Sequence, residues 1–154
     1  MGKGKNKRGK IPPTATSRSS DRRDIPIQEH ASPDQKKPSW RFGRFDDACL
    51  DWGIDTMKAN LETVLNGLKI YEGFTWHEIK TMTHDRGKSK NHSVKLEGLT
   101  KEAQNRLSQI KNDDITEVFS LRFNNMFRVI GIRDGAVLYI LWIDPDHKVC
   151  KVSH

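Results

Sequence analysis

The last forty residues of the chain consist of short runs of β-branched and aromatic residues separated by turn-forming residues. The runs are EVFSLRF, FRVIGIR, AVLYILWI and KVCKVS, and the breaks are Asn124-Asn125, Asp134-Gly135 and Asp144-Pro145-Asp146. This spacing is typical of hairpins, and Asp-Gly suits the positive φ angles of a type I′ turn. The pattern constrains the fold more than any other feature, because it predicts a four-strand antiparallel meander at the end of the chain.

Three segments before the meander have helical patterns. They run from about Cys49 to Tyr71, from Thr75 onward, and from Thr100 to Lys111. The first repeats apolar residues at spacings of three and four, and Thr75 with Glu78 matches a capping box. The aromatic residues that begin at Trp40, in WRFGRFDD, are spaced as in a strand. We therefore expect an α+β domain whose helices pack on the C-terminal meander.

Charge divides the chain into two parts. Residues 1–39 carry +6 of the formal net charge of +7, and residues 40–154 carry +1. The first part has almost no aliphatic pattern, so it cannot bury enough surface to offset the entropy of ordering. We predict a disordered basic tail over residues 1–39 and one folded domain over residues 40–154. The tail bases expected to bind nucleic acid by counterion release are Lys3, Lys5, Lys7, Arg8 and Lys10. Alternatively, the tail is a solubilising extension.

The chain carries no sign of export, membrane insertion or a bound metal. Its first residues lack the apolar core of a secretory signal, and no apolar run reaches the roughly 18 residues of a membrane span. Cys49 and Cys150 lie far apart without a CxxC partner, so we expect reduced thiols. The spacing of His77, His84 and Asp85 matches no metal motif. We expect a cytoplasmic protein without a cofactor, and no pattern indicates its oligomeric state.

Two arginines flank the first predicted turn of the meander. If Asn124–Met126 form a three-residue loop, Arg122 faces Arg128 on one side of the sheet. Like charges in that arrangement are unfavourable, unless the two guanidinium groups share an anion such as a phosphate. The alternatives are that each arginine pairs with an acid such as Glu117 or Asp146, or that a shorter loop moves Arg122 off this face.

The turn at the other end of the meander brings a histidine toward the arginines. A hairpin closed by Asp134-Gly135 places Arg128 opposite Leu141, so the turn from Asp144 to His147 lies at the same end of the sheet. An imidazole exchanges protons near neutral pH, which makes His147 the first candidate for proton transfer and His92 the second. The alternative is that His147, like most histidines in turns, is simply exposed to solvent.

A basic loop completes the candidate site. The segment from 83 to 92 is polar and basic, which predicts an exposed loop carrying Lys88 and Lys90. Together with the arginine pair and a histidine, it suits RNA cleavage without a metal: the histidine takes a proton from the 2′-hydroxyl, and the arginines stabilise charge on the phosphate.

The four tryptophans are more typical of a core than of stacking platforms.

The C-terminal run SLRFNNMFRVIGIRDGAVLYILWIDPDHKV resembles the end of RelE/ParE-superfamily toxins of bacterial toxin–antitoxin systems. In those proteins an arginine-bearing strand leads into a hairpin, an apolar strand and a histidine-bearing end. The matching positions here are Leu121-Arg122, Phe127-Arg128-Val129, the Asp134-Gly135 turn, Leu138–Ile143 and Asp146-His147-Lys148-Val149. The tyrosine often found near the end of the ribosome-dependent nucleases is absent.

This resemblance implies a RelE-like domain acting as an endoribonuclease or translation inhibitor. It carries over Arg122, Arg128 and His147 as functional residues, RNA or the ribosome as the target, and an antitoxin protein as the restraining partner. Some relatives bind a topoisomerase instead. Outside this family, the sequence also fits a non-enzymatic protein that binds nucleic acid or another protein through its basic tail.

Overall fold

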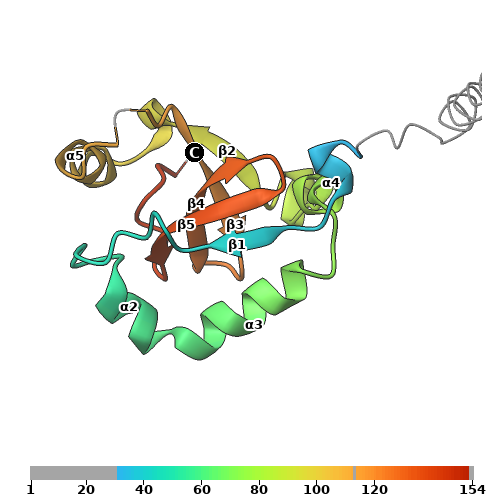
Figure 1. The fold of residues 1–154 in the computed structure, drawn as a ribbon, viewed down its shortest axis with the longest axis horizontal. Coiled ribbons are helices and arrows are strands. Elements are labelled where there is room, and N and C mark those ends of the chain that lie inside the picture. Colours follow the sequence, from blue (N-terminus) through green and yellow to red (C-terminus); the bar gives the residue numbers. More distant parts are fainter. Residues whose placement is uncertain (1–30, 113, 153–154) are drawn as a thin grey trace, which may run out of the picture. The chain divides into compact units, whose positions relative to one another are not determined.

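The computed structural model describes residues 31–112 and 114–152. The chain divides at Ala31, and the compact unit that follows contains every element described below. The described residues form four α-helices and one five-stranded mixed sheet, which confirms the α+β class (Figure 1). In chain order the elements are β1 (Ser39–Arg41), α2 (Ile54–Ala59), α3 (Leu61–Tyr71), α4 (Trp76–Thr81), β2 (His92–Lys95), α5 (Lys101–Gln109), β3 (Glu117–Arg122), β4 (Arg128–Asp134) and β5 (Val137–Asp144).

The sheet has the strand order β1-β5-β4-β3-β2. Strands β3, β4 and β5 form an antiparallel meander, β2 adds to it antiparallel to β3, and β1 lies parallel to β5. The predicted fourth meander strand is wrong, since the described residues 148–152 contribute one isolated bridge, between Leu99 and Cys150. The reason lies in Asp144, whose carboxylate accepts the backbone N–H groups of Lys148 and Val149 and turns the chain away from the sheet.

The register between β4 and β5 also differs from the predicted one. Arg128 lies opposite Asp144 instead of Leu141. The hairpin closes one residue later than expected, with Asp134 paired to Val137, and a bulge at Leu141 in β5, opposite the step from Ile130 to Gly131, shifts the pairing again. The candidate arginine therefore faces a carboxylate across the sheet.

Gly131 makes the bulge possible. A Cβ atom at this position would lie 2.6 Å from the carbonyl oxygen of Tyr139, so no other residue fits without a backbone shift. The bulge changes the alternation of side chains, so that Leu141 and Trp142 both join the core on the same side of the sheet.

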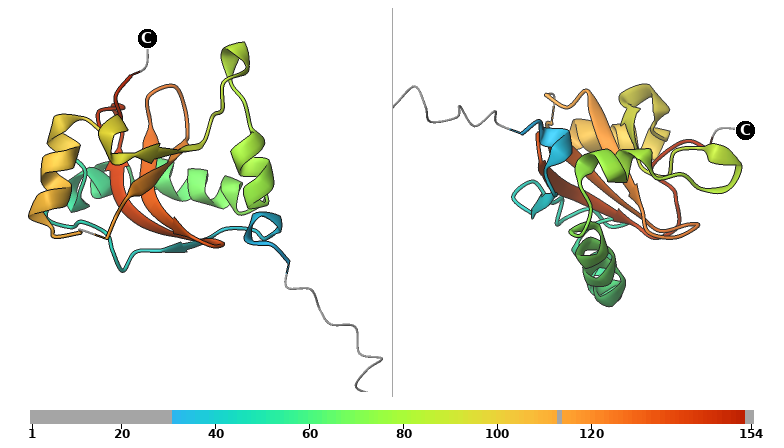
Figure 2. Two further views of the ribbon diagram at one scale, coloured as in Figure 1. Left: turned by 90° about the horizontal axis from the view of Figure 1, so that it is seen from above. Right: turned by 90° about the vertical axis from the view of Figure 1, so that its right-hand side faces the viewer.

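Helices cover both faces of the sheet, as Figure 2 shows. Side chains from α3 and α4 pack on one face, and side chains from α5 pack on the other. Because both faces are buried, β4 and β5 read as nearly continuous apolar runs in the sequence. The fully buried apolar side chains of β3 to β5 are those of Val118, Leu121, Val129, Ile130, Leu138, Ile140, Leu141, Trp142 and Ile143.

The helices follow their sequence patterns with one break. The segment from Cys49 to Tyr71 holds two helices, α2 and α3, because the backbone leaves helical geometry at Asn60 (φ −123°, ψ 21°). The predicted capping box is confirmed: Thr75 Oγ1 accepts the Glu78 N–H, and the Glu78 carboxylate accepts the Thr75 N–H. No helix among the described residues is long and apolar enough to cross a membrane.

The predicted tail, residues 1–39, lies mostly outside the described residues. Its last part belongs to the compact unit, because Pro33–Gln35 form a 3-10 helix. Asp34 in this helix forms ion pairs with Arg133 and with Lys80, the second at 2.8 Å. These pairs hold the pKa of Asp34 at about 2, and they attach the start of the compact unit to β4 and α4.

A buried carboxylate joins the loop after β1 to both α5 and β5. Asp46 is 8% exposed, and its two oxygens accept hydrogen bonds from the guanidinium of Arg106 at 2.6 and 2.7 Å. The indole N–H of Trp142 also donates to it, at 2.9 Å. Burial alone would raise the pKa of Asp46, but the bonds from Arg106 and Trp142 outweigh it and leave the pKa below its usual value.

We predict that Asp46→Ala lowers the free energy of unfolding by about 3 kcal/mol, because it removes the carboxylate that pairs with the Arg106 guanidinium and leaves the buried indole N–H of Trp142 without a partner. Chemical denaturation at neutral pH measures this loss. The stabilisation that the ionised Asp46 provides is complete above the pKa that its carboxyl has in the unfolded chain. It is lost as the pH falls through the lower pKa that the carboxyl has in the folded protein. The exposed Asp51→Ala is the matched control, with an expected change within about 0.5 kcal/mol. Equal stability of the two variants would contradict the assignment.

Candidate functional site

The arginine pair occupies the predicted positions. Arg122 and Arg128 lie directly opposite each other where β3 meets β4. The N–H of Phe123 donates to the carbonyl oxygen of Phe127 at 3.0 Å, which closes the three-residue loop Asn124–Met126. The predicted register of this hairpin is therefore confirmed, and both arginines project from the same face of the sheet.

Asn124 shapes the turn between the arginines. Its side-chain Oδ1 accepts the N–H groups of Met126 at 3.0 Å and Phe127 at 2.9 Å, an asparagine turn that fixes the loop. Its carbonyl oxygen accepts a second pair of bonds, from Arg122 Nε at 3.2 Å and Arg128 Nη1 at 2.8 Å. One neutral carbonyl thus holds the two guanidinium groups side by side.

The positive charges of the pair are not neutralised by an ion pair within the described residues. The alternative partners Glu117 and Asp146 do not bond to either arginine there. Arg122 instead donates to Asn125 Oδ1 at 2.8 Å. Burial, followed by the charge of Arg122, lowers the pKa of Arg128. The pair is therefore oriented by uncharged acceptors and retains its charge for an anion.

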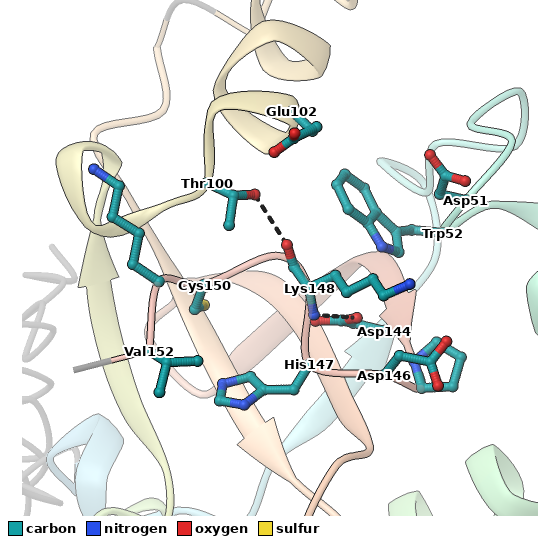
Figure 3. Close-up of a pocket in the computed structure, with 12 residues that line it drawn as sticks. Asp51, Trp52, Thr100, Glu102, Asp144, Asp146, His147, Lys148, Cys150 and Val152 are labelled. Carbon is teal, nitrogen blue, oxygen red and sulfur yellow. Dashed lines mark hydrogen bonds between the residues drawn. The ribbon is translucent and has the colours of Figure 1, made fainter. Parts of the chain in front are cut away.

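His147 is positioned by a buried carboxylate. Asp144, which is fully buried opposite Arg128, accepts the N–H groups of Lys148 and Val149, each at 2.9 Å. Figure 3 shows the bond from Lys148. These bonds close a tight loop in which His147 has a φ of 55°. Burial raises the pKa of Asp144, and the two backbone donors act against that rise. The loop geometry places the half-buried imidazole at the same end of the sheet as the arginines.

All of the described candidate residues line one basic cleft of about 780 Å³. Arg122 and Arg128 contribute from the sheet, His92 from the edge strand β2, and His147 from the loop after β5. The residues that line this cleft are His84, Lys88, Ser89, Lys90, His92, Ser93, Val94, Lys95, Gly98, Ser120, Arg122, Asn125, Arg128, His147, Cys150, Lys151 and Val152. The cleft lining contains no acidic residue. The tail bases predicted to bind nucleic acid, Lys3 to Lys10, lie outside the described residues.

Several residues of the cleft were not predicted from the sequence. Lys95 and Lys151 add two positive charges, and His84 adds a third imidazole. Lys95 belongs to β2, whose pairing with β3 was not predicted, because a four-residue strand carries no turn signal linking it to a distant partner. Lys151 was assigned to a strand that does not form. His84 was considered only as a metal ligand, and no cluster of three metal-binding side chains occurs in the described part of the chain.

Both candidate imidazoles favour the neutral form. Desolvation and then the charge of Arg128 lower the pKa of His92 below its usual value of 6.5, and His84 acts in the same direction. Desolvation and Arg128 also lower the pKa of His147, while Asp144 partly opposes them. At neutral pH each ring therefore carries a free nitrogen lone pair that can accept a proton.

A second pocket of about 550 Å³ adjoins the cleft and shares His147 and Cys150 with it. Figure 3 shows the carboxylates of Asp51 and Glu102 beside Trp52 in this pocket. Both cysteines of the chain are free and buried. Burial raises the pKa of the Cys150 thiol to about 11, so this thiol is protonated at neutral pH.

We predict that Arg128→Gln raises the pKa values of His92 and His147 toward 6.5, because the substitution removes a positive charge that disfavours each imidazolium. NMR titration of the imidazole protons measures both values. The control is Arg41→Gln, an exposed arginine on β1 at the opposite edge of the sheet, which should move neither. Unchanged pKa values in Arg128→Gln would show that the guanidinium does not act on these rings.

The chain matches no protein-family model, no curated protein and no solved structure. The geometry and charge of the basic cleft are therefore the grounds on which its function is inferred.

Proposed function

We propose that the protein is a toxin-type endoribonuclease that cleaves RNA by acid and base catalysis without a metal. The observation that carries the proposal is the basic cleft itself, in which Arg122 and Arg128 lie side by side without an ion pair among the described residues, and in which His92 and His147 also lie. Guanidinium groups bind phosphate oxygens, and neutral imidazoles accept protons. The C-terminal resemblance to RelE/ParE toxins supports the same activity.

The proposed reaction is an internal transfer at phosphorus. His147 takes the proton of the ribose 2′-hydroxyl, and the 2′-oxygen attacks the adjacent phosphorus. Arg122 and Arg128 stabilise the charge that develops on the phosphate oxygens. The bond from phosphorus to the 5′-oxygen breaks, and protonated His92 donates its proton to that oxygen. The products are a 2′,3′-cyclic phosphate and a 5′-hydroxyl end.

The proposed substrate is RNA instead of DNA, because the nucleophile is the 2′-hydroxyl that RNA alone carries. The lysines of the cleft, Lys88, Lys90, Lys95 and Lys151, would hold the phosphates on either side of the cleaved one. We further propose that the RNA is met free or on the ribosome, and that an antitoxin protein restrains the activity in the cell.

Expression of the intact chain in a bacterial host should arrest growth, and Arg128→Ala or His147→Ala should relieve the arrest. In a cleavage assay on RNA, loss of the arginine should lower kcat by about 10²- to 10³-fold, and loss of the general base by about 10²- to 10⁴-fold. Sequencing of RNA ends after brief induction locates the cuts. Arg41→Ala is the matched control and should stay toxic.

Equal toxicity of the wild type, Arg128→Ala and His147→Ala would eliminate the proposed chemistry. RNA that binds the cleft without being cut would instead favour a non-enzymatic binding protein. A salt-dependent affinity that both substitutions leave unchanged would place the binding elsewhere on the chain.

The pH dependence gives a separate test. The proposed reaction needs one neutral and one protonated imidazole, so kcat/KM should be bell-shaped, with a maximum midway between the two pKa values. Both pKa values lie below 6.5, so we predict a maximum on the acidic side of pH 6.5. Rates measured in buffers of constant ionic strength check this. A maximum well above pH 7 would rule out the pair His92 and His147 as the acid and base.

A further inference from the structure

Strand β3 continues two residues beyond the end of its partner β2. The β2 strand begins at His92, which lies opposite Ser120. Continuing this register would place Lys90 opposite Arg122, but the chain has already left the sheet there, and the N–H of Lys90 donates to the carbonyl oxygen of Met82 at 2.8 Å. The N–H and C=O of Arg122 therefore face an edge where no strand pairs with them.

Two buried side chains take the place of the missing strand. Asn91 is 1% exposed, and its Oδ1 accepts the N–H of Arg122 at 2.8 Å. Tyr71, at the end of α3, is 3% exposed and donates its hydroxyl proton to the carbonyl oxygen of Arg122 at 2.5 Å. The amide of Asn91 also donates to the carbonyl oxygen of Ile79 in α4 at 3.0 Å. Both backbone groups of Arg122 are thereby satisfied by side chains.

The orientation of the Asn91 amide follows from these partners. Rotated by half a turn, it would set its NH₂ group against the N–H of Arg122 and its oxygen against the carbonyl of Ile79, so that both of these backbone groups would lose their partner. The amide thus acts as a fixed connector between β3 and α4. This connection lets the basic loop leave the sheet at the point where Arg122 enters the cleft, so that Lys88 and Lys90 can line the other side.

We propose that Tyr71 and Asn91 are positioning residues that hold Arg122 for the reacting phosphate, an inference that rests on the proposed function. They contact Arg122 through its backbone and not the substrate. Because the backbone of Arg122 is held on both its N–H and its C=O, the guanidinium can move only through rotations of its own side chain. Donors that are already in place stabilise a transition state without having to reorganise during the reaction. Loss of either contact should therefore affect kcat more than KM.

The test uses Tyr71→Phe, which removes the hydroxyl and keeps the ring in the core. We expect kcat for cleavage of an RNA oligonucleotide to fall about 10-fold while KM stays within about twofold. The matched control is Tyr139→Phe, at the only other tyrosine of the chain, which should leave both parameters unchanged. Asn91→Ser, which shortens the connector, should reproduce the effect of Tyr71→Phe.

A double-mutant cycle separates positioning from general structural support. In an Arg122→Ala background, Tyr71→Phe should lower kcat no further, because the side chain that it positions is gone. A further 10-fold fall in that background, or a wild-type kcat in Tyr71→Phe alone, would overturn the inference.

If the wild type binds RNA without cleaving it, the proposed function fails and the inference is decided separately. The same cycle is then run on the dissociation constant for a single-stranded oligouridylate. A loss of affinity in Tyr71→Phe that vanishes in the Arg122→Ala background would keep the positioning role. Additive losses of affinity would show that Tyr71 does not act through Arg122 and would overturn the inference.

Discussion

The candidate site depends on a cross-strand pair of like charges, Arg122 opposite Arg128. Such a pair is unfavourable on its own, so the surrounding structure has to hold it in register. The backbone ladder of β3 and β4 does part of this, and the turn at Asn124 does the rest by offering one carbonyl oxygen to both guanidinium groups. The repulsion that remains is what an anion placed between the two guanidinium groups would relieve.

How well each part of the fold could be predicted depends on how far apart in the sequence the interacting residues are. The hairpin that carries the arginines was predictable, because a three-residue loop sets the register of its two strands locally. The register of the next hairpin was not, because its turn closes one residue later than the Asp-Gly pattern indicates and because no turn residue signals the bulge opposite Gly131. The pairing of β1 with β5 is non-local and parallel, and it joins segments about one hundred residues apart.

The register of β4 and β5 was predicted wrongly, yet Arg128 and His147 still lie at the same end of the sheet, and the structure gives the reason. The predicted neighbour of Arg128 was Leu141, and the observed one is Asp144. The charge of this buried carboxylate acts on the guanidinium of Arg128, but its oxygens bond to the backbone N–H groups of Lys148 and Val149. It therefore orients the loop of His147 and leaves Arg128 without an ion pair. The three side chains at this end of the sheet could be predicted from the sequence, but the carboxylate that positions the histidine could not.

The charge of the folded part shows why composition alone hides such a site. Residues 40–154 carry a net charge of only +1, which indicates a nearly neutral domain. The structure separates the charges in space: the cleft lining holds six lysines and arginines and no acid, while Asp51, Glu102 and Asp146 gather in the adjoining pocket. The histidine loop forms the boundary between them. His147 lines both, so its imidazole lies where the basic cleft adjoins the pocket that holds these carboxylates.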